Sequence, residues 1–336
     1  MRPHAMNVVD AYFRGKRALI TGGLGFIGSN LARRLVELGA DVVLVDSLVP
    51  EYGGNLFNID GIESRVRVNI SDVRDEYSMR TLIQGQDLLF NLAGQTSHLD
   101  SMQDPNTDLE INARAQLSIL ETCRKHNPGV KVVFASTRQI YGKPQYLPVD
   151  EKHLLIPVDV NGINKMAGEA YHVLYNNVYG IRACALRLTN TYGPRTRVKD
   201  ARQTFLGIWT RLILEGKPFE VWDGSQLRDF TYVDDAVEAF LLAAASEEAD
   251  GRVFNLGGAD PPISLKDLAD LLVGANGGGR YELRTFPSDR KRIDVGDYYA
   301  DDRAIRSALS WQPRMRLREG LAQMLEYYRQ HLPRYL

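Results

Sequence analysis

Residues 17–46 read RALITGGLGFIGSNLARRLVELGADVVLVD, and this stretch decides the fold. Residues 17–21 form a short apolar run that predicts a buried strand, and residues 26–38 repeat apolar side chains at helical spacing. Residues 41–46 form a second apolar run. Between the first strand and the helix lies the glycine cluster 22–28, GGLGFIG. The order strand, glycine loop, helix, strand is typical of a βαβ unit that binds a dinucleotide.

The glycine loop predicts a site for a pyrophosphate. Glycine permits the tight turn and lets backbone N–H groups approach a ligand, while the helix N-terminus adds unpaired donors and a positive dipole end. We therefore expect Gly22, Gly25, Phe26, Ile27 and Gly28 to bind the cofactor.

Asp46 ends the second predicted strand. A carboxylate at this position accepts hydrogen bonds from the hydroxyls of an adenosine ribose and repels a 2′-phosphate. The sequence therefore predicts NAD rather than NADP. An aspartate at a strand end can equally serve as a turn or cap residue.

Strands and helices alternate through the first half of the chain. Residues 66–70, 87–92, 130–135 and 181–188 read as buried strands, and residues 109–125 and 163–179 read as helices. Near-continuous apolar strands separated by helices predict an α/β fold, a Rossmann doubly wound parallel sheet covered on both faces.

The rhythm changes beyond residue 190. Short strands at 219–221 and 253–256 mix with helices at 233–245, 265–274 and 317–331. We predict a Rossmann domain at 1–189 and a smaller, mixed α/β substrate lobe at 190–336, partly interleaved with it.

Composition excludes several classes of protein. The 336 residues carry a net charge of −1 without a long block of like charge, so we expect no nucleic-acid partner. No stretch approaches about 20 apolar residues, and residues 1–16 lack the apolar run of a signal peptide, so we expect a cytoplasmic protein without a membrane partner. Two dispersed cysteines and six histidines show no metal spacing.

The spacing of Gly22, Gly25 and Gly28 resembles that of the extended short-chain dehydrogenase/reductase family, which includes the NAD-dependent nucleotide-sugar epimerases and dehydratases. The resemblance runs over nearly the whole chain. It includes NLAGQT at 91–96, a helix asparagine at 112, ST at 136–137 before YG at 141–142, LTNTYGP at 188–194, RDF at 228–230, YVDD at 232–235 and WQP at 311–313.

The resemblance implies roles for further residues. Asp72 and Val73 are similar to the family's adenine-contacting pair, and Leu92 and Ala93 to the segment beside the cofactor ribose. Thr137 is in the segment that carries the active-site hydroxyl.

On the substrate side, Asn190 and Arg228 lie in matching motifs. Arginine is geometrically suited to a diphosphate, so Arg228 and Arg292 are predicted to bind the nucleotide, although both have neighbouring aspartates for ion pairs. The implied substrate is a UDP-, dTDP-, GDP- or CDP-linked sugar, and the implied assembly is a homodimer through the helices near Leu109 and Ile163.

The sequence departs from the family at its catalytic Tyr-x-x-x-Lys pair. Lys165 is present, but Asn161 stands in the place of the tyrosine. An amide cannot act as a general base at neutral pH, although it can orient a hydroxyl or cap a helix. Thr137, Asn161 and Lys165 are nevertheless the predicted catalytic residues.

The missing tyrosine leaves three explanations open. Another group serves as base, with Lys165 first and Tyr141, Tyr192, His98 and His153 as further candidates. Alternatively a tyrosine enters from elsewhere, or the protein binds cofactor and sugar without turnover.

A second departure separates the chain from the dehydratases. In those enzymes Asp-Glu follows the threonine, whereas Arg138 and Gln139 follow Thr137 here. The first hypothesis is therefore a 4-epimerase of a nucleotide-linked hexose that works through a transient keto sugar. The alternatives are a reductase, a decarboxylase, a dehydratase with atypical acid/base groups, or a non-catalytic NAD and nucleotide-sugar binding protein.

Overall fold

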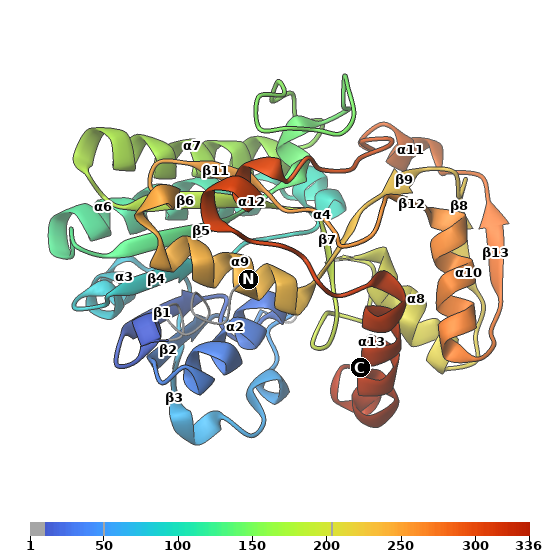
Figure 1. Cartoon of the computed structure of the whole chain (residues 1–336), viewed down its shortest axis with the longest axis horizontal. Coiled ribbons are helices and arrows are strands. Elements are labelled where there is room, and N and C mark those ends of the chain that lie inside the picture. Colours follow the sequence, from blue (N-terminus) through green and yellow to red (C-terminus); the bar gives the residue numbers. More distant parts are fainter. Residues whose placement is uncertain (1–10, 50, 203) are drawn as a thin grey trace.

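A sheet of seven parallel strands forms the centre of the protein, in the order β11-β6-β5-β4-β1-β2-β3 (Figure 1). The computed structural model describes residues 11–49, 51–202 and 204–336. The strands are β1 (Arg17–Thr21), β2 (Asp41–Asp46), β3 (Val66–Ile70), β4 (Leu88–Asn91), β5 (Lys131–Thr137), β6 (Ala183–Leu188) and β11 (Val253–Asn255). The predicted α/β class with a parallel Rossmann-like sheet is confirmed.

Helices cover both faces of this sheet. On one face lie α2 (Phe26–Glu37) and α9 (Val233–Ala245), and on the other lie α3 (Glu76–Ile83), α6 (Ala115–His126) and α7 (Val160–Tyr179). Successive residues of one strand point to opposite faces, so Ile20 joins the core under α2 and Leu19 the core under α6. Burial on both sides explains the near-continuous apolar strands.

The strand order reverses between β1 and β4. From β1 the chain builds outward through β2 and β3, and it then returns to add β4, β5, β6 and β11 on the other side. In open α/β sheets, ligands bind at the carboxyl ends of the strands beside such a switch point. The glycine loop after β1 and the segment after β4 both lie there.

A smaller lobe stands beside the carboxyl ends of the sheet (Figure 1). It contains α8 (Phe205–Leu214), β8 (Phe219–Trp222), α10 (Leu265–Asn276), β13 (Tyr281–Arg284) and α13 (Leu317–His331). Two short strand pairs connect the lobe to the sheet: β7 (Asn190–Tyr192) with β10 (Phe230–Tyr232), and β9 (Leu227–Arg228) with β12 (Ile263–Ser264). Four short helices lie outside these units: α4 (His98–Gln103), α5 (Pro105–Leu109), α11 (Ser288–Lys291) and α12 (Arg303–Leu309).

The two halves of the chain interleave. Both α9 and β11 follow residue 190 in sequence, yet β11 pairs with β6 at the edge of the large sheet and α9 packs on its face. The predicted division at residue 189 into a Rossmann domain and a substrate lobe therefore stays a prediction.

Several elements differ from the sequence prediction, which included neither α3 nor β13. The helix expected at 109–125 is divided into α5, a π-helical turn at Glu110–Arg114, and α6. The helix expected at 163–179 begins earlier, at Val160, because the Asp159 side chain accepts from Gly162 N at 2.7 Å and caps it. Asn161 is therefore inside α7, and its interpretation as the helix cap was wrong. The helix α8 was not predicted from the sequence.

Candidate active site

The glycine loop connects β1 to α2 with a geometry that only glycine permits. Gly22 has a φ of +67°, and a Cβ on Gly28 would lie 2.2 Å from the Gly22 carbonyl oxygen. Gly25 caps α2 without any side-chain hydrogen bond to the helix, which leaves the first N–H groups of α2 available to a ligand. An anion is the natural partner of such a helix end.

Asp46 lies next to this loop at the end of β2. Its carboxylate accepts from Leu24 N at 3.1 Å and from Leu48 N at 2.9 Å. Burial raises the pKa of Asp46, and these two hydrogen bonds oppose that effect. Asp46 lines the cavity.

Asp72 follows β3 and pairs with Arg74, whose guanidinium lies 2.6 Å from its carboxylate. Hydrogen bonds from Arg74 hold the pKa of Asp72 below its ordinary value, so this carboxylate stays charged. Val73 is buried beside it.

The segment after β4 is fixed by Thr21. The Thr21 hydroxyl accepts from Leu92 N at 3.0 Å and from Ala93 N at 3.1 Å. At the next residue, a Cβ on Gly94 would lie 2.8 Å from Lys165 Nζ and 2.9 Å from Asn112 Oδ1. The space over Gly94 is therefore a narrow cradle between the chain and the lysine.

Lys165 is buried on α7 and donates to Ala135 O at 3.1 Å. Burial lowers its pKa to about 8, although the carboxylate of Asp108 acts in the opposite direction. Asn112, in the π-helical turn, presents a buried Oδ1 without a hydrogen-bond partner. π-helical turns occur frequently at functional sites, and this one places an unsatisfied acceptor beside the lysine.

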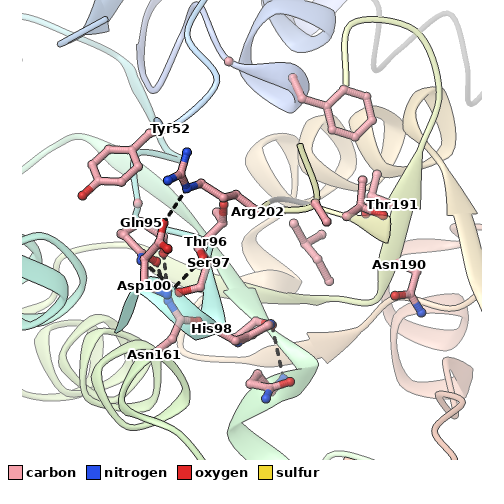
Figure 2. Close-up of a pocket in the computed structure, with 18 of the residues that line it drawn as sticks. Tyr52, Gln95, Thr96, Ser97, His98, Asp100, Asn161, Asn190, Thr191 and Arg202 are labelled. Atoms are coloured by element: carbon pink, nitrogen blue, oxygen red, sulfur yellow. Dashed lines mark hydrogen bonds and ion pairs between the residues drawn. The ribbon is translucent and has the colours of Figure 1, made fainter. Parts of the chain in front are cut away.

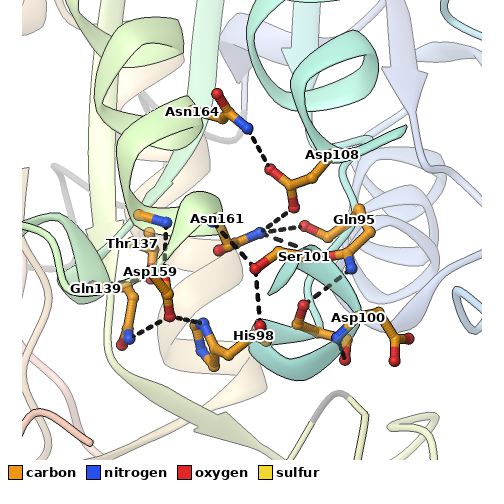
Figure 3. Close-up of polar contacts among 12 residues, drawn as sticks. Gln95, His98, Asp100, Ser101, Asp108, Thr137, Gln139, Asp159, Asn161 and Asn164 are labelled. Carbon is orange, nitrogen blue, oxygen red and sulfur yellow. Dashed lines mark hydrogen bonds and ion pairs between the residues drawn. The ribbon is translucent and has the colours of Figure 1, made fainter. Parts of the chain in front are cut away.

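Asn161 points toward the protein interior (Figure 3). Its side-chain Nδ2 donates to Gln95 O at 2.8 Å and to Asp108 Oδ2 at 3.0 Å. Asp108 also accepts from Asn112 and Asn164. The amide nitrogen therefore ties α7 to α5 and to the loop after β4, while the residue still lines the cavity.

Thr137 ends β5 and faces the cavity. Its hydroxyl accepts from Gln139 N at 3.2 Å, and the Gln139 side chain donates to Asp159 Oδ2 at 2.7 Å. The same carboxylate oxygen lies 2.9 Å from His98 Nδ1 (Figure 3). A chain of polar contacts thus runs from the hydroxyl segment to a histidine on α4.

On the substrate side, Asn190 and Arg228 line the cavity. Asn190 Oδ1 accepts from Arg138 at 3.3 Å, and its amide donates to Asp229 O at 3.0 Å. Arg228 is buried and lies 3.3 Å from Asp294, and burial together with the nearby Arg138 lowers its pKa to about 10.

One cavity of about 1150 Å³ joins these elements. It lies between the loop after β4 on one side and β7 on the other, with Gln95 and His98 facing Asn190 and Thr191 (Figure 2). The predicted site residues on its wall are Gly22, Gly25, Phe26, Ile27, Gly28, Asp46, Asp72, Val73, Leu92, Ala93, Thr137, Asn161, Lys165, Asn190 and Arg228. Arg292 is exposed and is not part of this wall.

Sequence reasoning missed Arg138 and gave no preference to His98. The sequence analysis considered Arg138 only because it replaces an acidic residue of the dehydratases. In the structure Arg138 lines the cavity, and its buried NH1 has no hydrogen-bond partner. Burial lowers its pKa. A basic residue directly after the hydroxyl position was the available signal. The signal for His98 was weaker, because its partner Asp159 is distant in sequence.

The described residues hold neither a metal cluster nor a membrane-spanning helix. Among them, no group of three or more His, Cys, Asp or Glu side chains is arranged to hold a metal ion. No helix in the same part of the chain is long and apolar enough to cross a membrane. Cys123 and Cys184 are buried and unpaired, and burial raises the pKa of each to about 12.

Known proteins match the chain in both sequence and fold. The NAD dependent epimerase/dehydratase family model matches residues 18–257. A UDP-glucose 4-epimerase of Mycolicibacterium smegmatis is 30% identical over 315 residues, which cover 93% of this chain and 98% of that protein.

Solved structures agree with this match. The UDP-glucose 4-epimerase of Thermotoga maritima with UDP-glucose superposes with a TM-score of 0.84 at 31% identity, covering 94% of this chain and 99% of that one. The Thermus thermophilus UDP-glucose 4-epimerase with NAD gives 0.83 at 28% identity, covering 93% and 99%. The glycine loop, Asp46 at the end of β2 and the fold agree with this match over nearly the whole length. The chain belongs to the NAD-dependent epimerase/dehydratase family of nucleotide-sugar enzymes.

Proposed function

We propose that the protein is a 4-epimerase of a nucleotide-linked hexose that works through a transient keto sugar. The observation that carries this proposal is a single cavity of about 1150 Å³ whose wall includes the glycine loop, Thr137, Lys165 and Arg228. A pocket for one drug-sized ligand measures roughly 300–1000 Å³, so this cavity suits a cofactor and a second ligand together. The relatives named UDP-glucose 4-epimerases favour the 4-carbon.

The residues around the glycine loop fit NAD. In the proposal the N–H groups at Phe26 and Ile27 hold the pyrophosphate, and the Asp46 carboxylate accepts from ribose hydroxyls. Asp72 and Val73 border the adenine, and Leu92 and Ala93 border the ribose. The uncapped helix end and the close approach of Gly28 to Gly22 support these assignments.

NAD supplies a hydride acceptor when bound, and the same hydride returns to the opposite face of the sugar. Lys165 then holds the nicotinamide ribose in the cradle over Gly94. Thr137 hydrogen-bonds the reacting sugar oxygen, and Asn161 fixes the loop that carries Gln95. Asn190 and Arg228 bind the nucleotide sugar from the other side, and Arg138 adds a donor that lacks a protein partner.

The residues after Thr137 disfavour a dehydratase. Dehydration of a sugar needs an acid and a base that protonate and deprotonate it. Arg138 carries no acceptor, and the Gln139 amide does not exchange protons at neutral pH. Its side chain donates to Asp159. Epimerisation makes no such demand on these two positions.

A homodimer is part of the proposal. On α7, Ile163, Leu174 and Val178 are 49%, 47% and 61% exposed and repeat at a spacing that places them on one helix face. Leu109, 47% exposed, lies on α5, which packs against α7. Apolar side chains that gather on one outer face are typical of a protein–protein interface.

The test is to release bound small molecules from the purified protein and to incubate the protein with UDP-, GDP-, CDP- and dTDP-hexoses in the presence of NAD. Mass spectrometry and NMR follow the sugars. The proposal predicts an isomer of unchanged mass with an inverted C4 centre. Loss of water or carbon dioxide indicates a dehydratase or a decarboxylase. Tight binding of these nucleotides without conversion of any of them indicates a binding protein.

A further inference from the structure

The proposed reaction needs a group that exchanges a proton with the sugar hydroxyl, and most candidates from the sequence are not near the cavity. The Tyr141 hydroxyl donates to Asn255 Oδ1 at 2.7 Å in the interior, and burial raises its pKa to about 12. Burial also raises the pKa of Tyr192, which packs under α13. Both ring nitrogens of His153 contact backbone groups, at 2.8 and 2.7 Å. Among the described residues, none of these three lines the cavity.

The candidates that do line the cavity are Lys165 and His98, together with Tyr52 from the loop after β2. Lys165 already donates to Ala135 O and lies over Gly94, where it suits the cofactor ribose. Tyr52 is the only tyrosine on the wall among the described residues. Burial raises its pKa, and the charges that act on it include Arg74 and also Asp100 of α4, so it stays the second candidate.

His98 has the geometry of a histidine held for proton transfer. It is the first residue of α4, directly after the loop that leaves β4, and its side chain is 41% exposed. Nδ1 is buried and lies 2.9 Å from Asp159 Oδ2, which is ion-pair distance, although the contact lacks the geometry of a hydrogen bond. Because Nδ1 is covered while the side chain as a whole is 41% exposed and lines the cavity, we infer that Nε2 is the ring nitrogen open to a ligand.

Asp159 is built to remain a carboxylate. Its side chain is completely buried and accepts from Gly162 N and from the Gln139 side chain, both at 2.7 Å. Burial alone raises its pKa, but the close contact with His98 and these two donors together hold the pKa below its ordinary value. A carboxylate on Nδ1 fixes the tautomer in which Nε2 carries the free lone pair.

The pair lies beside the hydroxyl position of the family. Gln139 connects them, because its backbone N–H donates to Thr137 and its side chain donates to Asp159 (Figure 3). His98 and Thr137 both line the cavity and are linked through Gln139 and Asp159.

We propose that His98 is the catalytic acid/base of this protein, oriented by Asp159, and that it performs the proton transfer that the missing tyrosine performs elsewhere in the family. The inference rests on the proposed epimerase function. As the sugar C–H bond breaks, its electron pair leaves as hydride to NAD⁺, which is reduced. The O–H proton passes to His98 Nε2, and the carbon and oxygen form a carbonyl. The reverse transfers restore the alcohol with the opposite configuration.

The charged groups around His98 come from each neighbouring element. They are Asp100 on α4 with its partner Arg202, Asp104 and Asp108 beside or on α5, Asp159 at the start of α7, and Arg138 after β5. Of these groups Asp159 contacts the His98 ring, so replacing Asp159 gives the sharpest test of whether it orients His98.

The test compares three variants on the sugar that the wild type converts. His98→Ala and His98→Gln are expected to lower kcat by 10²- to 10⁴-fold while the Kd for NAD stays unchanged. Imidazole in the buffer is expected to restore part of the His98→Ala rate. His126→Ala, an exposed histidine on α6, serves as the matched control and keeps full activity.

Asp159→Asn keeps the cap on α7 and tests the positioning role. A carboxylate stabilises the imidazolium form, so its loss lowers the pKa of the base. The acid limb of the kcat/KM profile is then expected to move to lower pH, with kcat reduced and KM little changed. A purely structural role would not move that limb.

The outcomes separate this inference from the function on which it rests. A wild type that converts none of the sugars overturns the proposed function and, with it, the role of His98. An active wild type whose His98 variants keep normal kcat overturns the inference alone, and so does a loss of activity confined to Tyr52→Phe.

Discussion

At the residue scale, the buried Lys165 makes the stability of the protein depend on pH. Burial lowers its pKa to about 8, whereas an unfolded lysine titrates near 10.4. Between these values the unfolded chain binds more protons than the folded chain, so the contribution of Lys165 to the free energy of unfolding rises with pH. Lys165→Met removes this group. From pH 7 to pH 10.5 the wild type is therefore expected to gain about 3 kcal/mol of unfolding free energy relative to the variant.

Urea unfolding of both NAD-free proteins across that range, followed by circular dichroism, measures this difference. A difference that stays constant with pH would mean that the lysine is not held in a desolvated site.

Asn161 is the residue whose replacement most directly tests the buried polar cluster. Asn161→Leu keeps the size of the side chain but leaves Asp108 and the Gln95 carbonyl each without one donor. Both acceptors keep a hydrogen bond from Asn112, so the substitution removes two hydrogen bonds, one of them to a carboxylate, and is expected to cost about 2 kcal/mol of unfolding free energy. Gln330→Leu, exposed on α13, is expected to change stability by less than about 0.5 kcal/mol. Equal effects of the two substitutions in urea unfolding would contradict the interior role.

Sequence spacing could predict some residues of the candidate site but not others. Gly22, Gly25, Gly28 and Asp46 were predictable, because their roles follow from one contiguous strand–loop–helix–strand segment. The contact between His98 and Asp159 was not, because it depends on how α4 and α7 pack, and no periodicity encodes that contact.

At the element scale, the junction of β1 and α2 depends on glycine at position 28. A Cβ there would meet the Gly22 carbonyl oxygen at 2.2 Å and Gly23 Cα at 2.9 Å, and neither backbone atom can rotate away. Gly28→Ala is expected to displace α2 from the loop and to weaken NAD binding at least about 100-fold, or about 3 kcal/mol.

Isothermal titration with NAD measures that loss. Gly274→Ala is the matched control, since this glycine also lies in a helix, α10, and a Cβ added there would have nothing within 4 Å. The control is expected to bind NAD normally and to gain about 0.5–1 kcal/mol of stability from better helix propensity. Normal NAD affinity in Gly28→Ala would show that the loop tolerates the extra methyl group.

Elements with strong periodicity were predicted closely, and those shaped by neighbours were not. The bounds of β1, β2, β3, α9 and α13 agree with the sequence prediction. The segment 109–125 reads as helical by spacing alone, yet a π-helical turn lies within it, where Asn112 bonds to the loop after β4 and Gln116 bonds to Asn91 of β4. The segment of α8 is an exception, because Phe205, Ile208, Trp209 and Leu212 have helical spacing that was available in the sequence but was not used.

At the scale of the whole molecule, interleaving explains why the site could be only partly predicted. The glycine loop and Asp46 come from one contiguous segment, whereas the substrate side depends on β7 pairing with β10, two short strands that are distant in sequence within the second half of the chain. That pairing brings Asn190 near Arg228, and a sequence motif identifies each residue but not their common cavity.

The outer face of α7 gives the prediction for the assembled protein. If Leu174 and Val178 lie in a dimer interface, two glutamates there bury charge without partners, and dimer dissociation is expected to become about 100-fold easier. Light scattering after size exclusion should give twice the chain mass for the wild type and the chain mass for Leu174→Glu/Val178→Glu at micromolar concentration. Leu56→Glu, 56% exposed on another surface, should remain dimeric. A monomeric wild type would contradict the dimer itself. A dimeric double variant would place the interface on another surface. In either case the exposed Leu174 and Val178 of α7 would have another role than dimerisation.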